Sequence, residues 1–454
     1  MYSTKINDIA EKIGVNIPTI LLPNEEISLE KWAVVACDQY TSEPEYWQET
    51  ENIVGDSHST LNLIFPEIYL ENEGKKERMQ KINKTMQRYM DEHILVPQKP
   101  GFIYVERETS RKKTRKGLIL AVDLEKYDYS RGSQSLIRAT EGTVLDRLPP
   151  RIKIRENAPI ELPHIMLLID DPLKTVIEPL NDIKGSLEVV YDFDLMMNGG
   201  HIKGYKVEKE EHISSVLQAL EKLAEPEVFY TKYNVGKDKG VLLFAAGDGN
   251  HSLATAKACW DKIKENLPPE EASDHPARYA LVEVVNIHDD GLDFHPIHRV
   301  VFNADPESFL KEAVNYYNSN GQDASYEIYS NGNDRANIND NKKQHIINFV
   351  YDKTEGALIV KNPVCTLEVG TLQTFLDYML KDNSKIKVDY IHGKDVVYKL
   401  GTQKGNIGFY LPSINKSDLF KTVILEDALP KKTFSMGEAE EKRYYLECRR
   451  ISNN

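Results

Sequence analysis

Asp248, Asn250, His251 and Ser252 lie almost next to one another in the segment Val241–Ile263. A carboxylate can hold a metal ion, and an imidazole can take or give a proton near neutral pH. We therefore assign Asp248 and His251 to catalysis, and Asp248 also to metal binding. The predicted phosphate-binding residues of this segment are Gly247, Gly249, Asn250 and Ser252.

The flanking residues predict how these groups are held. Val241–Ala246 is an apolar run typical of a buried strand, and Leu253, Ala256 and Trp260 recur at helical spacing. Between them, glycines tolerate the tight backbone of a turn. The N–H groups and the positive dipole end at the start of such a helix suit an anion. The spacing fits equally well a turn that only reverses the chain, because serine is also a common helix cap.

A second group of candidates lies nearer the N-terminus. Asp38 follows the apolar run Trp32–Cys37, at a strand end of the kind where α/β enzymes collect functional groups. Arg138 and Arg147 flank Glu141 in a basic stretch that could attract an anionic substrate. We interpret Asp38 and Glu141 as alternates to His251 in acid–base catalysis, and the two arginines as phosphate ligands. A capped turn and a solvated basic face are the structural alternatives.

Three histidines, His288, His295 and His298, share residues 288–299 with three aspartates and could ligate a metal. The pair His295 and His298 spans a proline, so it is not the helical pair of zinc peptidases, and zinc is disfavoured. An arginine fork matches phosphate oxygens. We therefore interpret His298 and Arg299 as a phosphate clamp.

Composition restricts the classes of function. The chain has 454 residues and a formal net charge of −14, with a pI of about 5.5. This acidic balance disfavours nucleic-acid binding, which usually needs a basic face. No apolar run approaches the roughly 20 residues of a membrane span, and the N-terminus lacks an apolar signal region. We expect a cytoplasmic protein with no nucleic-acid or membrane partner.

Strand-like and helix-like segments alternate irregularly along the chain. This pattern predicts an α/β or α+β fold, in which helices pack on a mixed sheet. The length suggests more than one substructure. The polar, low-complexity stretch Ser330–Lys343 is the predicted boundary between an N-terminal part, residues 1–330 with the GDGNH loop, and a C-terminal part, residues 331–454.

Three motifs together resemble domain-of-unknown-function family 1015 over nearly the whole chain. The family's D-G-H-H-R-like loop after a strand is matched by Asp248–Ser252, and its G-L-x-x-x-P-x-H-R element by Gly291–Arg299. A C-terminal P-x-K-[ST] loop is matched by Pro430–Thr433. The chain departs from the pattern at Asn250 and Ser252, where many relatives have His and Arg.

This resemblance names a family rather than an activity. Its D-G-x-H loop is similar to that of the ParB, sulfiredoxin and free-serine-kinase group, where the loop holds nucleotide phosphates. That similarity implies a ParB/sulfiredoxin-like core, with ATP or ADP and a Mg²⁺ ion on Asp248 as cofactors. Lys432 and Thr433 of the third motif join the predicted phosphate-binding residues. Family genes often neighbour serine-biosynthesis genes, which implies phosphoserine or serine as the first substrate to consider.

The leading hypothesis is an enzyme of phosphoryl transfer or phosphate-ester hydrolysis on a small hydroxy acid. Kinase and phosphatase directions both stay open, and a small phosphorylated metabolite is the expected partner. A nucleotide-responsive binding or regulatory protein is the first alternative. A metal-dependent hydrolase that uses His288, His295 and His298 is the second. The oligomeric state has no sequence signal.

Overall fold

The computed structural model describes residues 2–70, 73–109, 113–329, 344–383 and 385–453. Contacts between residues divide the chain into two compact units. Unit 1 contains Met1–Asp293 and Met436–Asn454, and unit 2 contains Phe294–Ser435. Unit 2 is therefore inserted into the sequence of unit 1, which resumes in the last residues of the chain.

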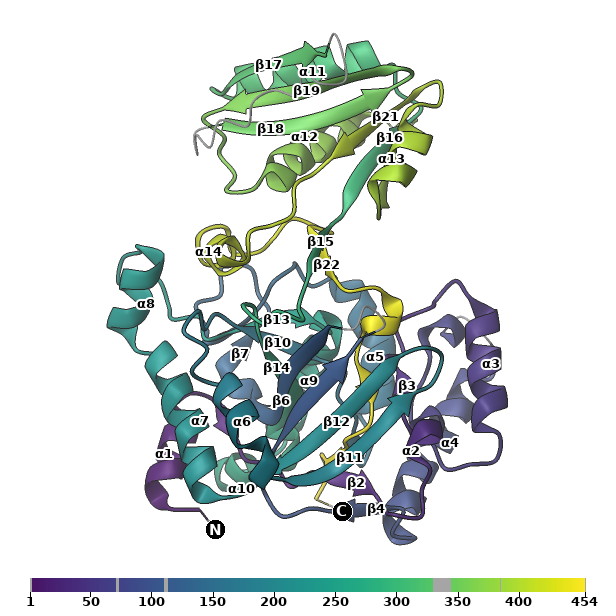
Figure 1. Ribbon diagram of the computed structural model, residues 1–454, viewed down its shortest axis with the longest axis vertical. Coiled ribbons are helices and arrows are strands. Elements are labelled where there is room, and N and C mark those ends of the chain that lie inside the picture. Colours follow the sequence, from purple (N-terminus) through teal and green to yellow (C-terminus); the bar gives the residue numbers. More distant parts are fainter. Residues whose placement is uncertain (1, 71–72, 110–112, 330–343, 384, 454) are drawn as a thin grey trace. The chain divides into compact units, whose positions relative to one another are not determined.

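A mixed sheet forms the centre of unit 1 (Figure 1). Its strand order is β11 (Glu188–Leu195), β12 (Gly200–Val207), β5 (Phe102–Glu108), β6 (Thr114–Asp123), β14 (Tyr279–Asn286), β10 (Met166–Ile169), β13 (Phe244–Asp248), β8 (Ile137–Ala139) and β7 (Tyr127–Asp128), with β1 (Val15–Asn16) also paired to β6. The pairs β10–β14, β13–β8 and β7–β8 are parallel, and the other neighbours are antiparallel.

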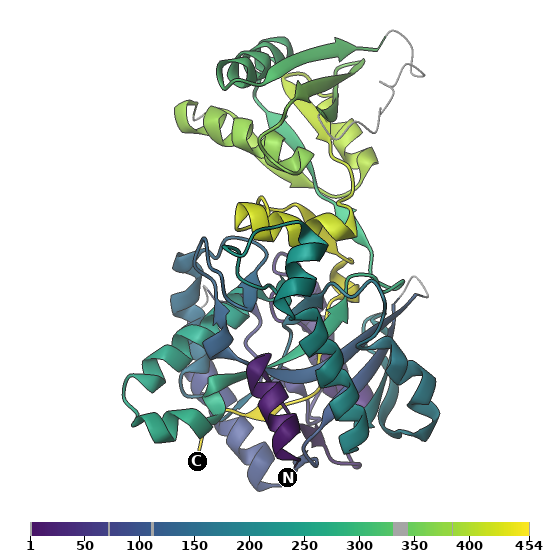
Figure 2. The same cartoon turned by 90° about the vertical axis from the view of Figure 1, so that its left-hand side faces the viewer.

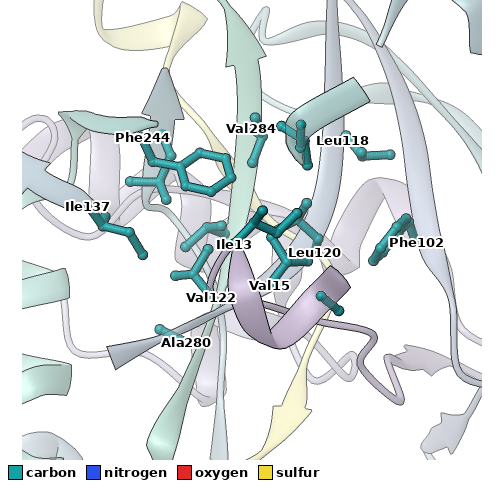
Figure 3. Packing of buried hydrophobic residues seen from close by; sticks show 14 of the residues in the cluster. Ile13, Val15, Phe102, Leu118, Leu120, Val122, Ile137, Phe244, Ala280 and Val284 are labelled. Atoms are coloured by element: carbon teal, nitrogen blue, oxygen red, sulfur yellow. The ribbon is translucent and has the colours of Figure 1, made fainter. Parts of the chain in front are cut away.

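Successive side chains of a strand point to opposite faces of the sheet, and in the central strands the side chains on both faces are buried. Phe102 and Tyr104 belong to one hydrophobic cluster, whereas Ile103 and Val105 belong to another. In the first cluster, Phe102 lies with Leu118, Leu120 and other apolar residues of the neighbouring strands (Figure 3). The central part of the sheet is thus a layer between two hydrophobic cores, whereas the edge strand β11 exposes alternate side chains.

Helices supply the other half of each core. On the first face, α1, α6, α7 and α9 contribute apolar residues, and Figure 2 looks onto the side that α1 covers. On the second face, α2, α3 and α4 do so. The unit 1 helices are α1 (Thr4–Lys12), α2 (Leu29–Trp32), α3 (Pro44–Val54), α4 (Lys75–Asp91), α5 (Leu148–Arg155), α6 (Glu178–Ile183), α7 (Glu210–Leu223), α8 (Pro226–Tyr233), α9 (Asn250–Lys264) and α10 (Pro269–Asp274).

The C-terminal segment Met436–Asn454, which we call the tail, runs along the second face of unit 1. Its strands pair with early parts of the chain: β23 (Tyr444–Tyr445) with β3 (Val34–Val35), and β24 (Arg449–Arg450) with β9 (Ile160–Glu161). A further small sheet joins β2 (Leu21–Pro23) to β4 (Leu95–Pro97).

Buried ion pairs and hydrogen bonds join the tail to the rest of unit 1. Arg443, which is 3% exposed, pairs with the buried carboxylates of Glu283 on β14 and of Glu447. Arg107 donates to the carbonyl of Glu440 at 3.0 Å and stacks over the ring of Tyr444. Removing one member of a buried ion pair is strongly destabilising, so these contacts make the tail part of the unit 1 fold.

Unit 2 is built on an antiparallel sheet in the order β17 (Asp323–Ile328), β19 (Thr354–Lys361), β18 (Gln344–Tyr351), β21 (Asn406–Tyr410), β16 (His298–Phe302) and β20 (Lys387–Ile391). Its helices are α11 (Pro306–Ser319), α12 (Glu368–Asp382), α13 (Lys394–Gly401) and α14 (Lys416–Glu426). The strands β15 (Phe294–Pro296) and β22 (Phe434–Met436), where the chain enters and leaves the unit, pair with each other.

The fold confirms the predicted mixed sheet with helices packed on it. The boundary predicted at residue 330 stays a prediction, because residues 330–343 lie outside the described residues. The strands on either side of that segment, β17 and β18, belong to one sheet of unit 2. None of the described helices combines the length and the apolar character needed to cross a membrane.

Candidate active site

The predicted strand–loop–helix is present as β13, Gly249 and α9. The strand is shifted relative to Val241–Ala246: β13 begins at Phe244 and ends with Asp248 itself. The carboxyl ends of the parallel strands β13 and β8 lie at one edge of the sheet, in the register Ala246 to Ala139. The antiparallel β10 starts at the same edge, with Met166 opposite Asp248. Three strand ends therefore surround the first turn of α9.

Gly249 makes the sharp connection between Asp248 and α9. Its φ is +73°, in the left-handed region that L side chains rarely adopt. A Cβ atom at this position would lie 2.9 Å from the Cα of Ile165. At Gly247, a Cβ would approach the side chains of Leu168 and Met436 to 2.8 and 2.9 Å. Gly249 is therefore required by the backbone, and Gly247 is favoured by the side chains packed against it, whatever ligand the loop takes.

Asp248 is held by an ion pair that reaches across the sequence. Its Oδ2 lies 3.1 Å from the Nζ of Lys442 in the tail, and its Oδ1 accepts the N–H of Gly249 at 2.9 Å. Burial opposes ionisation of the carboxyl, but the charge and hydrogen bond of Lys442 outweigh it, and the pKa of Asp248 is lowered. Asp248 is thus an anion that already carries a cationic partner.

Ser252, in the first turn of α9, contacts a histidine. Its Oγ lies 2.8 Å from the Nε2 of His164, two residues before β10. The other ring nitrogen, Nδ1, lies 2.9 Å from the hydroxyl of Tyr445 in the tail. That hydroxyl also accepts the N–H of Cys37 at 3.2 Å. Four segments that are distant in sequence meet in this chain of hydrogen bonds.

His251 and Asn250 lie beside this group. The Nε2 of His251 accepts the backbone N–H of Val144 at 3.3 Å. The neutral imidazole therefore carries its proton on Nδ1. The side-chain oxygen of Asn250 is buried, and no donor in the described part of the chain reaches it. An acceptor of this kind suits a hydroxyl or ammonium group of a ligand.

Asp38 is half-buried just after β3, and its Oδ1 accepts the side-chain amide of Gln39 at 3.0 Å. The preceding residue, Cys37, shares the hydrogen bond to Tyr445, which brings Asp38 into the same neighbourhood. Burial, reinforced by the charge of Asp38, raises the pKa of the Cys37 thiol. Cys37 is therefore a thiol at neutral pH and not a thiolate nucleophile.

The three candidate residues of the basic stretch, Arg138, Glu141 and Arg147, lie in different environments. Glu141 is half-buried just after β8, and its neighbour Thr140 donates to the carbonyl of Ala246 at 2.6 Å. Arg138 is only 3% exposed and donates to the carbonyls of Ser135 and Gly240, so it fixes the chain around β8. The side chain of Arg147 is exposed.

The predicted clamp residues His298 and Arg299 are buried in unit 2. The Nδ1 of His298 accepts the N–H of Leu411 at 3.0 Å, and burial followed by nearby cations lowers the pKa of His298 to about 4. Arg299 donates to the carbonyls of Lys431 and Lys432, at 2.7 and 3.0 Å. His298 is thus neutral at pH 7. Arg299 stabilises the Pro430–Thr433 loop through its hydrogen bonds to two of the loop's carbonyls.

Two further residues of that loop were predicted to bind phosphate. The Thr433 hydroxyl is buried and donates to the carbonyl of Pro430 at 2.6 Å. The side chain of Lys432 is exposed, and its backbone has a φ of +54°. The contacts inside unit 2 therefore account for the loop conformation without a ligand.

The three histidines of the metal-hydrolase alternative have separate environments. His288 lies in unit 1, where its Nε2 contacts the Oδ1 of Asp170 at 2.7 Å. His295 and His298 belong to unit 2. Within the described ranges, no group of three His, Cys, Asp or Glu side chains has the arrangement of a metal site.

Sequence reasoning missed three residues of this site: His164, Lys442 and Tyr445. His164 precedes an apolar strand with no motif around it, and the other two lie in the tail. Their contacts join residues 194 and 281 positions apart, as 442 minus 248 and 445 minus 164 show. No periodicity or spacing rule connects positions so distant.

Comparison with known proteins identifies relatives but no activity. The family profile described as "Protein of unknown function (DUF1015)" matches residues 20–379. No curated protein matches the chain. Among solved structures, a free serine kinase variant in complex with ADP is similar with a TM-score of 0.38 and 12% identity, over 76% of this chain and 95% of that one.

Two other solved structures are similar to a comparable degree. A conserved hypothetical protein from Pyrococcus furiosus gives a TM-score of 0.34 at 12% identity, over 72% of this chain and 90% of that one. SbnI with a C-terminal truncation, from Staphylococcus aureus, gives 0.33 at 10% identity, over 70% and 83%. Likenesses at these scores carry no argument about function or about a ParB-like core.

Proposed function

Because this chain belongs to the DUF1015 family, whose function is unknown, we propose an activity from its site: phosphoryl transfer or phosphate-ester hydrolysis on a small hydroxy acid, with phosphoserine or serine as the first substrate to test. The observation that carries this proposal is the Asp248–Lys442 pair at the start of α9, with a glycine on each side of Asp248. It supplies an anion and a cation beside the first N–H groups of a helix, which have no partner within that helix.

Lys442 and the start of α9 would bind the phosphoryl group. The first N–H groups of a helix have no partner within that helix and point at an incoming anion, and the helix dipole favours negative charge there. The Lys442 ammonium, already beside Asp248, would stabilise the charge that develops on the transferring oxygens. Removal of one such donor typically costs about 3 kcal/mol in the barrier.

His251 would act as the general acid or base. Its neutral ring carries the proton on Nδ1, since Nε2 accepts the Val144 N–H. The ring acts as a general acid from its protonated form, in which both nitrogens carry a proton, so Nε2 must exchange its contact with the Val144 N–H for a proton. The buried oxygen of Asn250 would accept a hydrogen bond from the hydroxy acid. Asp38 and Glu141 remain alternates to His251 because both are half-buried near the site.

Mg²⁺ and a nucleotide belong to the proposal as cofactors of a kinase direction. Mg²⁺ is commonly held by one or two carboxylates together with substrate phosphates, so Asp248 alone could anchor it. The Lys442 contact occupies one side of that carboxylate, which favours a metal brought in with the substrate. ATP or ADP would be the phosphoryl donor or acceptor.

A ligand screen followed by a turnover assay tests the proposal. Thermal melting is measured with serine, phosphoserine, inorganic phosphate, ADP and ATP, each with and without Mg²⁺. A ligand at a hundred times its dissociation constant stabilises by about 2.7 kcal/mol, which is visible as a higher Tm. Phosphate release from phosphoserine, and ADP formation from ATP with serine, report turnover.

A matched lysine variant makes this assay specific. We expect Lys442→Ala to lower kcat/KM about a hundredfold, because the transferring oxygens lose their cation. Lys257→Ala is the control: Lys257 lies on α9, is similarly buried, and pairs with Asp261 at 2.7 Å. A nucleotide-induced shift without turnover would instead favour the regulatory alternative. No shift with any ligand would overturn the proposal.

A further inference from the structure

Ser252 and His164 have the geometry of an activated nucleophile and its base. Such a pair is recognised by a hydroxyl within hydrogen-bond reach of an imidazole whose other nitrogen is fixed by a third group. Here the Ser252 Oγ lies 2.8 Å from His164 Nε2, and the Tyr445 hydroxyl lies 2.9 Å from His164 Nδ1. The rings of His164 and Tyr445 meet edge to face, with centroids 5.5 Å apart.

The base role requires the tautomer of His164 that carries its proton on Nδ1. The Tyr445 hydroxyl, 2.9 Å from Nδ1, also accepts the Cys37 N–H at 3.2 Å. A hydroxyl oxygen has two acceptor positions, so the second can take the N–H of His164 Nδ1. The lone pair of Nε2 then faces Ser252 and accepts its proton.

The surroundings favour the charge that this transfer creates. Asp248, held as an anion by Lys442, interacts electrostatically with His164. Ser252 is in the first turn of α9, where the helix N–H groups favour an anionic group on the serine oxygen. Ser252 and His164 are both half-buried, and Tyr445 is only 3% exposed. The two reacting residues are therefore partly exposed, and their orienting residue is buried.

We propose that Ser252 is a covalent nucleophile, with His164 as its general base and Tyr445 as a positioning residue. This inference deepens the proposed function and rests on it for the substrate class, a phosphate monoester. The Ser252 oxygen forms a bond to phosphorus while the bond from phosphorus to the ester oxygen breaks. In this route His164, and not His251, carries the proton: it passes from Ser252 to His164 Nε2 and then to the departing oxygen, which releases the hydroxy acid.

Water completes the cycle. It attacks the phosphorus of phosphoserine 252 and gives its proton to His164 Nε2. The bond from phosphorus to the Ser252 oxygen breaks, inorganic phosphate leaves, and the proton returns to the serine oxygen. Atoms and charge balance with water as the sole co-reactant.

Two measurements test this inference on the full-length protein. A fluorophosphonate probe, which phosphonylates activated serines, is followed by peptide mass spectrometry. Acid-quenched protein that has turned over phosphoserine is also analysed for a phosphoryl group on Ser252. We expect the probe adduct and the phosphoryl group on Ser252 in the wild type, and neither in Ser252→Ala. Ser214→Ala, which removes a hydroxyl on α7 that contacts Gln218, is the matched control and should label normally.

Variants of His164 and Tyr445 distinguish the general base from the residue that positions it. His164→Gln should slow labelling at least about a hundredfold, the scale of a lost general base. Tyr445→Phe keeps the ring and should lower kcat for phosphate release without raising KM, because it disturbs the tautomer rather than binding. Equal labelling of wild type and His164→Gln, or unchanged kcat in Tyr445→Phe, would overturn the respective role.

The outcomes also distinguish this inference from the function on which it rests. Phosphate release that persists in Ser252→Ala would overturn the covalent route and leave the proposed function standing. Probe labelling of Ser252 without turnover of phosphoserine or ATP would support the nucleophile and overturn the proposed substrate class. Absence of any adduct in folded wild-type protein would overturn the nucleophile.

Discussion

Gly249 shows how a single residue can decide whether the site forms. Its left-handed backbone and the 2.9 Å approach to Ile165 leave no room for a side chain. We expect Gly249→Ala to lower the free energy of unfolding by about 1–2 kcal/mol, the cost of a left-handed L residue. Urea denaturation followed by circular dichroism measures this loss. Gly142→Ala is the control, because a Cβ there meets nothing within 4 Å. Equal losses in both variants would contradict the argument.

The residue scale also shows where sequence patterns carry information. Asp248, Gly249 and His251 were identifiable because turn chemistry and helix spacing are local. The partners of Asp248 and Ser252 were not, because Lys442 and His164 come from other segments. Local rules predict which residue begins a helix. They do not predict which distant side chain will pair with a charged residue beside that helix.

At the scale of elements, β16 carries a pH-sensitive contact. His298 accepts the Leu411 N–H through an unprotonated nitrogen, and its pKa is lowered to about 4. Between that value and the unfolded value of about 6.5, the unfolded chain binds more protons than the folded one. The contribution of neutral His298 to the free energy of unfolding is therefore complete above pH 6.5, and it is lost as the pH falls towards 4.

We expect His298→Asn to weaken this pH dependence, because an amide oxygen can accept the same N–H without titrating. Tm is measured for wild type and variant from pH 7.5 to pH 4.5. The difference between the two curves isolates His298 from the other titrating groups, including its neighbour His392. Parallel curves would show that His298 does not titrate with unfolding.

Element types were more predictable than element membership. The alternation of strands and helices predicted a mixed sheet, and the central sheet of unit 1 confirms it, whereas the sheet of unit 2 is antiparallel. The run Val241–Ala246 was shifted by a few residues relative to β13, since apolar character continues before the first paired residue. The pairing of β23 with β3 joins chain ends that no local pattern relates.

At the scale of the whole molecule, unit 2 is an insertion whose entry and exit strands, β15 and β22, pair with each other. We expect unit 1 to fold when residues 294–435 are replaced by a short Gly/Ser linker, because the buried contacts of its tail remain. A cooperative thermal transition and a monodisperse elution profile would show this. Aggregation or a non-cooperative melt would mean that unit 1 needs the insertion in order to fold.

The path of the tail has a consequence for how the protein is made. Translation proceeds from the N-terminus, so Asp248, His164 and Ser252 are synthesised well before Lys442 and Tyr445. A nascent chain, or one cut short by premature termination before Met436, lacks both partners and the arginine that neutralises Glu283. The proposed chemistry is thereby withheld until the segment that contains Lys442 and Tyr445 has been synthesised.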